Sequence, residues 1–144
     1  MEPSEAIEAG RKILDGVLLP AAFAFVPGAA GKGSGGTFAS AAYVRGERRL
    51  EFSYRWAVGE VTYYIGDDAL GHDSYMRLLH VYAQSEFARF SRDEPLAGFE
   101  ALGHDLKHFC GDFLTGPGTE FQMLARRLKA DPKCIGGFRA LDRY

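Results

Sequence analysis

The segment TFASAAYVRGERRLEFSYRWAVGEVTYYI, residues 37–65, decides the fold of this chain. Apolar and polar side chains alternate along it, and a period of two places successive side chains on opposite faces of a β-strand. Glycine suits the first central position of a type II′ turn, so Gly46-Glu47 predicts a hairpin. In that hairpin Tyr43 lies opposite Leu50, with Ala41 opposite Phe52 and Ala39 opposite Tyr54.

A second turn, predicted at Val58-Gly59, places Trp56 opposite Val61 and Tyr54 opposite Tyr63. Both turns define the same apolar face, made of Leu50, Phe52, Tyr54, Trp56, Val61, Tyr63 and Ile65. The opposite, wetter face holds Arg49, Glu51, Ser53, Arg55, Thr62 and Tyr64. Antiparallel sheets can leave one face to water, so the segment predicts a meander that helices cover on one side.

Helical spacing of apolar residues predicts helices over 4–19, 73–83, 95–113 and 119–129, and a first strand over 21–26. Asp73 is expected to cap the second helix, and Thr119 with Gln122 the last one. The tail offers Ile135, Phe138 and Leu141 for packing. The predicted fold is one α+β domain over residues 1–144, with an N-terminal helix, an antiparallel β-meander of about four strands, and three C-terminal helices packed on one sheet face.

Composition narrows the class of protein. The chain has 144 residues, of which 47% are hydrophobic and 25% are charged, and this excludes a disordered chain. The net charge of −2 predicts no general attraction to nucleic acid or to an anionic membrane. The first residues include acids where a secretory signal would be basic, so we expect a cytoplasmic protein with Cys110 and Cys134 as reduced thiols.

The glycine-rich stretch GAAGKGSGGTF, residues 28–38, contains G-x-G-x-x-G at Gly31, Gly33 and Gly36. A dinucleotide site of that type needs a helix after the glycines, because the helix N-terminus holds the pyrophosphate. Here an alternating strand follows, and the Walker pattern also fails. Two interpretations stay open: a flexible hairpin connection, or a flap that grips a ligand through Lys32 and Gly33. No cofactor is predicted.

Four histidines provide the candidates for catalysis and metal binding. His104 and His108 are four residues apart and share a helix face, which makes them candidate metal ligands, although no third ligand accompanies them. His72 and Asp68 lie where the chain leaves the sheet, and they are the candidate acid/base pair. The alternative for this second group is a solvated turn.

The wetter sheet face provides the candidate binding surface. Arg49, Arg55 and Tyr64 could bind a partner or an acidic ligand, and Arg45 and Arg48 add to a local basic patch. The alternative is a solvated face in which Glu51 pairs with neighbouring arginines.

In size and in the order of its elements the chain resembles small bacterial proteins, including immunity proteins and uncharacterised domains, a resemblance of architecture that does not dictate function. The sequence is rich in aromatic residues and poor in catalytic arrangements. We therefore expect a small cytoplasmic binding or protein-interaction domain, with a partner protein or a small anionic ligand and without nucleic acid or membrane. The alternative is a small enzyme, or a nucleotide- or phosphate-binding domain, that uses the glycine-rich loop and His72.

Overall fold

The computed structural model describes residues 1–33 and 35–135. A helix, α1 (Pro3–Leu18), precedes a five-stranded antiparallel sheet of β1 (Ala24–Gly33), β2 (Gly36–Arg45), β3 (Arg48–Tyr54), β4 (Val58–Ile65) and β5 (Asp68–Gly71) in sequence order. After the sheet come α2 (His72–Leu78), the short helices η1 (Tyr82–Gln84) and η2 (Phe87–Arg89), α3 (Ala97–Phe109), α4 (Gly111–Leu114) and α5 (Thr119–Ala130). The predicted α+β architecture is confirmed, with one strand more than expected.

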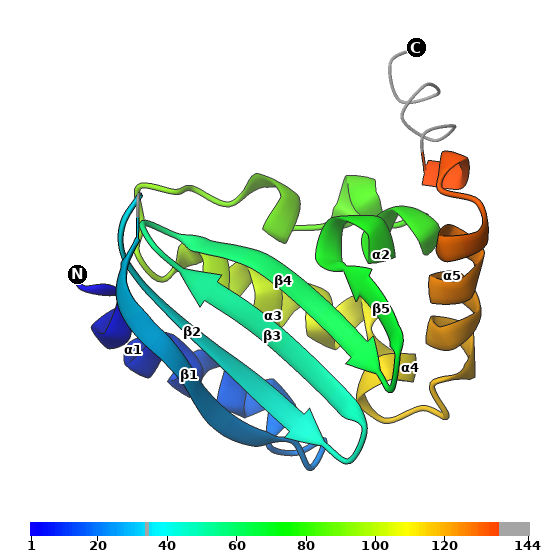
Figure 1. The fold of residues 1–144 in the computed structure, drawn as a ribbon, viewed down its shortest axis with the longest axis horizontal. Coiled ribbons are helices and arrows are strands. Elements are labelled where there is room, and N and C mark those ends of the chain that lie inside the picture. The colour runs from blue at the N-terminus through cyan, green and yellow to red at the C-terminus, as the bar shows by residue number, and fades with distance from the viewer. Residues whose placement is uncertain (34, 136–144) are drawn as a thin grey trace.

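Helices cover one face of the sheet. Figure 1 shows α1 and α3 behind the strands, with the other sheet face open toward the viewer. The two helices cross closely, because a Cβ on Gly10 would lie 2.4 Å from the Phe99 ring. The core between helices and sheet is rich in aromatic side chains, which include Phe52, Tyr63 and Phe113. The uncovered side is called the outer face below.

The predicted register of β2 and β3 is confirmed. Tyr43 pairs with Leu50, Ala41 with Phe52, and Ala39 with Tyr54. All six of these side chains are at most 4% exposed, so the burial of one face fixes the register.

The predicted register of β3 and β4 is wrong by four residues. Tyr63 pairs with Leu50 rather than with Tyr54, because Tyr54 pairs with Val58 and the chain reverses over residues 55–57. The pairing then shifts at Glu60 and Val61, which together lie opposite Phe52 in a β-bulge. An even shift keeps the same side chains inward, so Val61, Tyr63 and Ile65 are still buried.

Trp56 is not part of the core, contrary to the prediction. It lies at the tip of the β3–β4 hairpin, and 73% of its surface is exposed. Val58 is buried instead, at 1% exposure, because it is the first residue of β4 and faces the helices. Because the chain turns at residues 55–57 rather than at Val58-Gly59, Trp56 lies on the surface and Val58 is part of the core.

The glycine-rich stretch belongs to a strand and is not a long loop. β1 continues to Gly33, which pairs with Gly36 of β2. Gly28 and Ala29 form a bulge opposite Ser40, and a Cβ on Gly28 would lie 2.8 Å from the Ser40 carbonyl oxygen. Glycine at residue 28 thus lets β1 approach β2 despite the bulge.

Two helix caps also differ from the prediction. Asp73 lies inside α2, where it accepts a hydrogen bond from Arg77, and the residue before the helix is Gly71. The first turn of α5 is capped from another helix: the Asp112 carboxylate accepts from the backbone N–H groups of Gly118 and Phe121. The predicted helix over 95–113 is divided at Cys110 into α3 and α4.

Of the tail, Ile135 is buried in the core, and Phe138 and Leu141 lie outside the described residues. Both cysteines are free. None of the helices in the described ranges combines the length and the apolar character needed to cross a bilayer.

Candidate functional site

The outer face of the sheet contains a groove. One hollow of about 220 Å³ has Gly28, Ser40 and Ser53 among its lining residues. A second, of about 500 Å³, lies at the tip of the β3–β4 hairpin. Ser40, Ser53 and Glu60 line both hollows, so the two adjoin, and we call them together the outer groove.

Strand alternation places small side chains along the floor of the outer groove. Ser40 and Ala42 alternate with the inward Ala41 and Tyr43 on β2, and Ser53 follows the inward Phe52 on β3. Ser40 also receives a hydrogen bond from the Ala29 backbone N–H, at 3.1 Å from nitrogen to Oγ. Small side chains leave the strand backbones accessible from the outer side.

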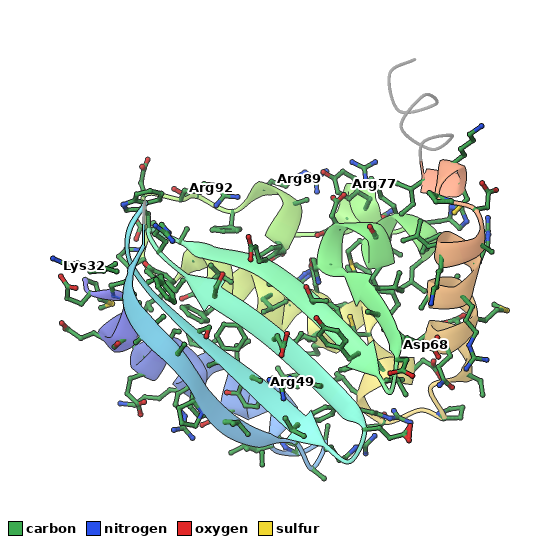
Figure 2. All side chains as sticks on the ribbon, viewed as in Figure 1. Lys32, Arg49, Asp68, Arg77, Arg89 and Arg92 are labelled. Atoms are coloured by element: carbon green, nitrogen blue, oxygen red, sulfur yellow. The ribbon has the colours of Figure 1, made fainter. Side chains whose placement is uncertain are left out.

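One end of the outer groove carries a charge-paired cluster. The Arg49 guanidinium donates to the Glu51 carboxylate, and Figure 2 shows Arg49 over the open face of the sheet. Partial burial, and then the neighbouring Glu51, raise the pKa of Tyr64. Arg49 and Glu51 are two residues apart on β3, so this pair lies within one strand and gives Arg49 an acidic partner at this end of the groove.

The other end is aromatic and cationic. The Arg55 guanidinium carbon lies 5.8 Å from the ring centres of both Phe38 and Trp56. Its Nη1 atom faces the Gly36 carbonyl oxygen at 3.4 Å, and a Cβ on Gly35 would lie 2.3 Å from Nη1. Arg92, from the segment before α3, lines the same hollow.

Glu60 joins the two ends of the outer groove. It is one of three non-glycine residues of the described chain with positive φ, at 50°. Such a backbone conformation costs an ordinary residue on the order of 1 kcal/mol, and it occurs here in the β4 bulge. The bulge places an exposed carboxylate in the middle of the groove, where it lines both hollows.

The predicted binding residues are distributed over separate places. Gly33 and Arg55 come together, because a Cβ on Gly33 would lie 3.5 Å from an Arg55 nitrogen. Arg49 and Tyr64 are at the opposite end of β3 and β4. Lys32 lines a different hollow, of about 370 Å³, beside the first residues of the chain (Figure 2). Of the remaining arginines, Arg45 lies over the Phe23 ring, and Arg48 donates to the carbonyl oxygens of Asp112 and Phe113.

His72 is buried at the junction of β4, α2 and α3. Its Nε2 lies 2.8 Å from Oδ2 of Asp105, and its Nδ1 lies 2.7 Å from the Tyr63 hydroxyl. Since an ionised carboxylate only accepts, Nε2 carries a proton, and in the neutral imidazole Nδ1 then accepts from the Tyr63 hydroxyl. Both ring nitrogens are thus occupied within the protein, and neither is free to exchange a proton with a ligand.

Asp105 is the centre of this buried network. Its carboxylate also accepts from the Ser85 hydroxyl, from the Glu86 backbone N–H at 2.9 Å, and from Nδ1 of His104 at 2.9 Å. Burial alone would raise the pKa of Asp105, but the hydrogen bonds from His72, Ser85 and His104 outweigh it and hold the pKa well below 3.8. The network joins the segment after η1 to α3.

The same surroundings suppress the acidity of two neighbouring groups. Burial raises the pKa of the Tyr63 hydroxyl well above its ordinary value, and it raises the pKa of the Cys110 thiol to about 12. A hollow of about 220 Å³ lies next to His72 and is lined also by Tyr82, Phe87 and Arg92. Both ring nitrogens of His72 are hydrogen-bonded within the network rather than free toward that hollow.

The other predicted catalytic and metal residues are also engaged. Asp68 pairs with Arg126 at 3.0 Å and accepts from Gln122, so it does not join His72. The His104 and His108 rings stack at 4.3 Å, and Nδ1 of His108 donates to the His104 carbonyl oxygen. Within residues 1–33 and 35–135 no three His, Cys, Asp or Glu side chains cluster in a way that could hold a metal ion.

Sequence reasoning missed Asp105 and most of the groove. Asp105 follows Leu102 by three residues and precedes Leu106, so the helical period itself placed it on the buried face. Its neighbours His104 and Lys107 made it look like a surface residue. The contribution of Trp56, Glu60 and Arg92 to one hollow depends on the turn, which the sequence predicted at Val58-Gly59, and on the β4 bulge, which it did not predict.

No family model matches this sequence, and neither does any curated protein or any solved structure.

Proposed function

We propose that this chain is a protein-binding domain and that the outer groove is its docking surface. The main support is the open sheet face, which is hollowed over four strands and carries a tryptophan that is 73% exposed. Exposed apolar patches mark interaction sites, and two large exposed hydrophobic residues, Trp56 and Val26, line the two hollows.

The side chains of the outer groove agree with this role. Trp and Arg are the residue types most enriched among those that dominate binding energy at protein interfaces, and Trp56, Arg55 and Arg92 line one hollow. The floor of small residues allows a partner segment to approach the sheet closely, and the Arg49–Glu51 pair forms a polar rim.

The enzymatic alternative has no comparable support. His72 uses both ring nitrogens inside the protein, and Lys32 lines a hollow that shares no described residue with the hollow beside His72. The glycines serve the β1 bulge and the packing of Arg55. A phosphate-gripping flap that acts together with His72 would need these two places to meet.

Site-specific photo-crosslinking tests the proposal. A photoreactive amino acid is introduced at Ser53 or Thr62 on the outer face, and at Lys12 on α1 or Arg127 on α5 as controls. After irradiation in cells we expect a discrete protein adduct from the outer positions and none from the helical ones. The adduct partner is then purified, and its affinity for this chain is measured by calorimetry.

Two results decide the outcome. Trp56→Ala should weaken the purified complex by at least about tenfold, since buried tryptophans at interfaces contribute about 2 kcal/mol or more. Lys12→Ala, on the helical side, should leave the affinity unchanged. Adducts from the α1 and α5 positions alone, or a complex insensitive to Trp56→Ala, would contradict the proposal.

A further inference from the structure

We infer that the outer groove binds an acidic segment of its partner, with a carboxylate held between Arg55 and Arg92 and an apolar group packed on Trp56. This inference rests on the proposed protein-binding function and specifies the chemistry of the partner. Its basis is the charge of the hollow at the β3–β4 tip, which is lined by two arginines and one acid, Glu60.

The arginines on this side of the molecule differ in how they are engaged. Figure 2 shows Arg92, Arg89 and Arg77 along the edge formed by the segment from α2 to α3. Arg77 donates to Asp73, and Arg89 donates to the carbonyl oxygens of Tyr82 and Ser85. Arg92 contacts the ring of Phe90, with its guanidinium carbon 5.1 Å from the ring centre.

Arg55 and Arg92 have no acidic partner within residues 1–33 and 35–135. Among the described residues Arg55 makes one hydrogen bond, to a carbonyl oxygen at 3.4 Å, and a guanidinium has five N–H donors. Arg49, in contrast, already pairs with Glu51. Of the arginines that line the outer groove, Arg55 and Arg92 therefore remain to bind a carboxylate of a partner, and both lie at the end that carries Trp56.

Arg55 is also held in place before a partner arrives. It lies by the rings of Phe38 and Trp56 and against the glycine backbone, where a side chain on Gly35 would collide with it. A guanidinium fixed against aromatic rings loses less conformational entropy when it forms a bidentate pair with a carboxylate. A preorganised arginine beside an exposed tryptophan matches an acidic residue followed by an apolar one.

Glu60 refines the expected specificity. Its carboxylate lines the same hollow and would repel a segment that is acidic throughout. The acid of the partner should therefore face Arg55 and Arg92, and its neighbouring residues should be neutral. Removing the charge of Glu60 should strengthen the binding of an acidic segment, whereas removing the arginine charges should weaken it.

Trp56 provides the readout, because it is the only tryptophan of the chain. The intact protein is titrated with three short capped peptides that lack tryptophan and tyrosine and contain leucine. The first has aspartate and glutamate at alternate positions, the second has lysine at those positions, and the third has serine. We expect the acidic peptide to shift the Trp56 emission saturably and to bind at least tenfold more tightly than the other two, with an affinity that falls as salt increases.

The variants are compared by the anisotropy of the same peptides carrying a dye. Arg55→Gln with Arg92→Gln should weaken the acidic peptide about tenfold and remove most of its salt dependence. Glu60→Gln should tighten it about threefold, a change of opposite sign that partial unfolding could not produce. Lys12→Gln, which removes one charge on α1, is the matched control and should have no effect. Circular dichroism verifies the fold of each variant.

The outcomes separate this inference from the proposed function. Tighter binding of the lysine or serine peptide, with a Trp56 response, would overturn the acidic specificity and leave the outer groove as a docking surface. A single-stranded oligonucleotide that competes more strongly than the acidic peptide would also overturn it. Absence of any Trp56 response to the peptides would refute the inference, whereas a crosslinked partner lost on Trp56→Ala would still support the proposed function.

Discussion

At the scale of a single residue, Ala22 adopts a backbone conformation that alanine rarely has. It follows α1 and has a φ of 70°, in the left-handed region. The chain turns there because the Phe23 backbone N–H donates to the Leu18 carbonyl oxygen at 3.0 Å, a bond that closes the helix end. Glycine normally occupies such a position, and an alanine there keeps a steric cost of roughly 1 kcal/mol.

We predict that Ala22→Gly stabilises the protein by about 0.5–1 kcal/mol, because glycine adopts positive φ without that cost. The same substitution at Ala9, inside α1, should destabilise it by about 0.5–1 kcal/mol, because it increases the freedom of the unfolded chain without relieving strain. Urea unfolding of both variants measures the difference. A loss of stability with Ala22→Gly would show that the turn does not store strain.

At the scale of an element, helix α1 contains two glycines whose surroundings differ. A Cβ on Gly10 would lie 2.4 Å from the Phe99 ring, whereas a Cβ on Gly16 would have no atom within 4 Å. Gly10 lets α1 cross α3 closely, and Gly16 lies on the exposed side of the same helix.

Gly16→Ala should therefore raise the free energy of unfolding by about 1 kcal/mol through helix propensity. Gly10→Ala should lower it by roughly 1–3 kcal/mol, because the added methyl group displaces Phe99 from a packed core. Thermal unfolding monitored by circular dichroism gives both values. If Gly10→Ala also stabilised the protein, the close crossing of α1 and α3 would be refuted.

The strands show how far sequence can predict a sheet. The β2–β3 register was predictable because Gly46 turns the chain tightly and alternation continues unbroken on both sides. The β3–β4 register was not, because the turn lies at residues 55–57 and a bulge at Glu60 follows it. Glutamate rarely adopts positive φ, so no local preference marked the bulge.

The candidate site depended on the same errors and on long-range contacts. Arg49 and Tyr64 alternate with the core side chains of β3 and β4 as predicted, because that assignment needs only the period of two, whereas Arg55 lies in the chain reversal between the two strands. The place of Trp56 beside Arg92 could not be predicted, since it requires the true turn and the path of the segment before α3. The buried network around Asp105 joins residues 63 to 105, and no spacing in the sequence encodes that contact.

At the scale of the whole molecule, the helices and their connections meet the sheet on one side, and the buried network lies at their junction. Asp105 on α3 binds His72 of α2 and Ser85 of the connecting segment, and His72 in turn binds Tyr63 of β4. Four parts of the chain thus depend on one carboxylate. The network lies on the helix-covered side of the sheet, away from the outer groove.

The network makes stability depend on pH in a defined direction. The pKa of Asp105 in the folded protein is held below its ordinary value of 3.8, so the unfolded chain takes up the proton first as the pH falls. The stabilisation is complete above about pH 4 to 5 and is lost progressively below that range. We predict that Asp105→Asn costs roughly 2–4 kcal/mol at neutral pH and that this cost shrinks as the pH falls from 5 toward 2.

Asp93→Asn is the matched control, because Asp93 is exposed and should change stability by less than about 0.5 kcal/mol at every pH. Urea unfolding at a series of pH values measures both variants. If Asp105→Asn is too unstable to fold, carboxyl NMR of the natural protein gives the same information, since the Asp105 signal should stay that of an ionised group well below pH 3.8. A cost that is independent of pH, or an Asp105 that titrates at its ordinary value, would show that its hydrogen bonds do not outweigh its burial.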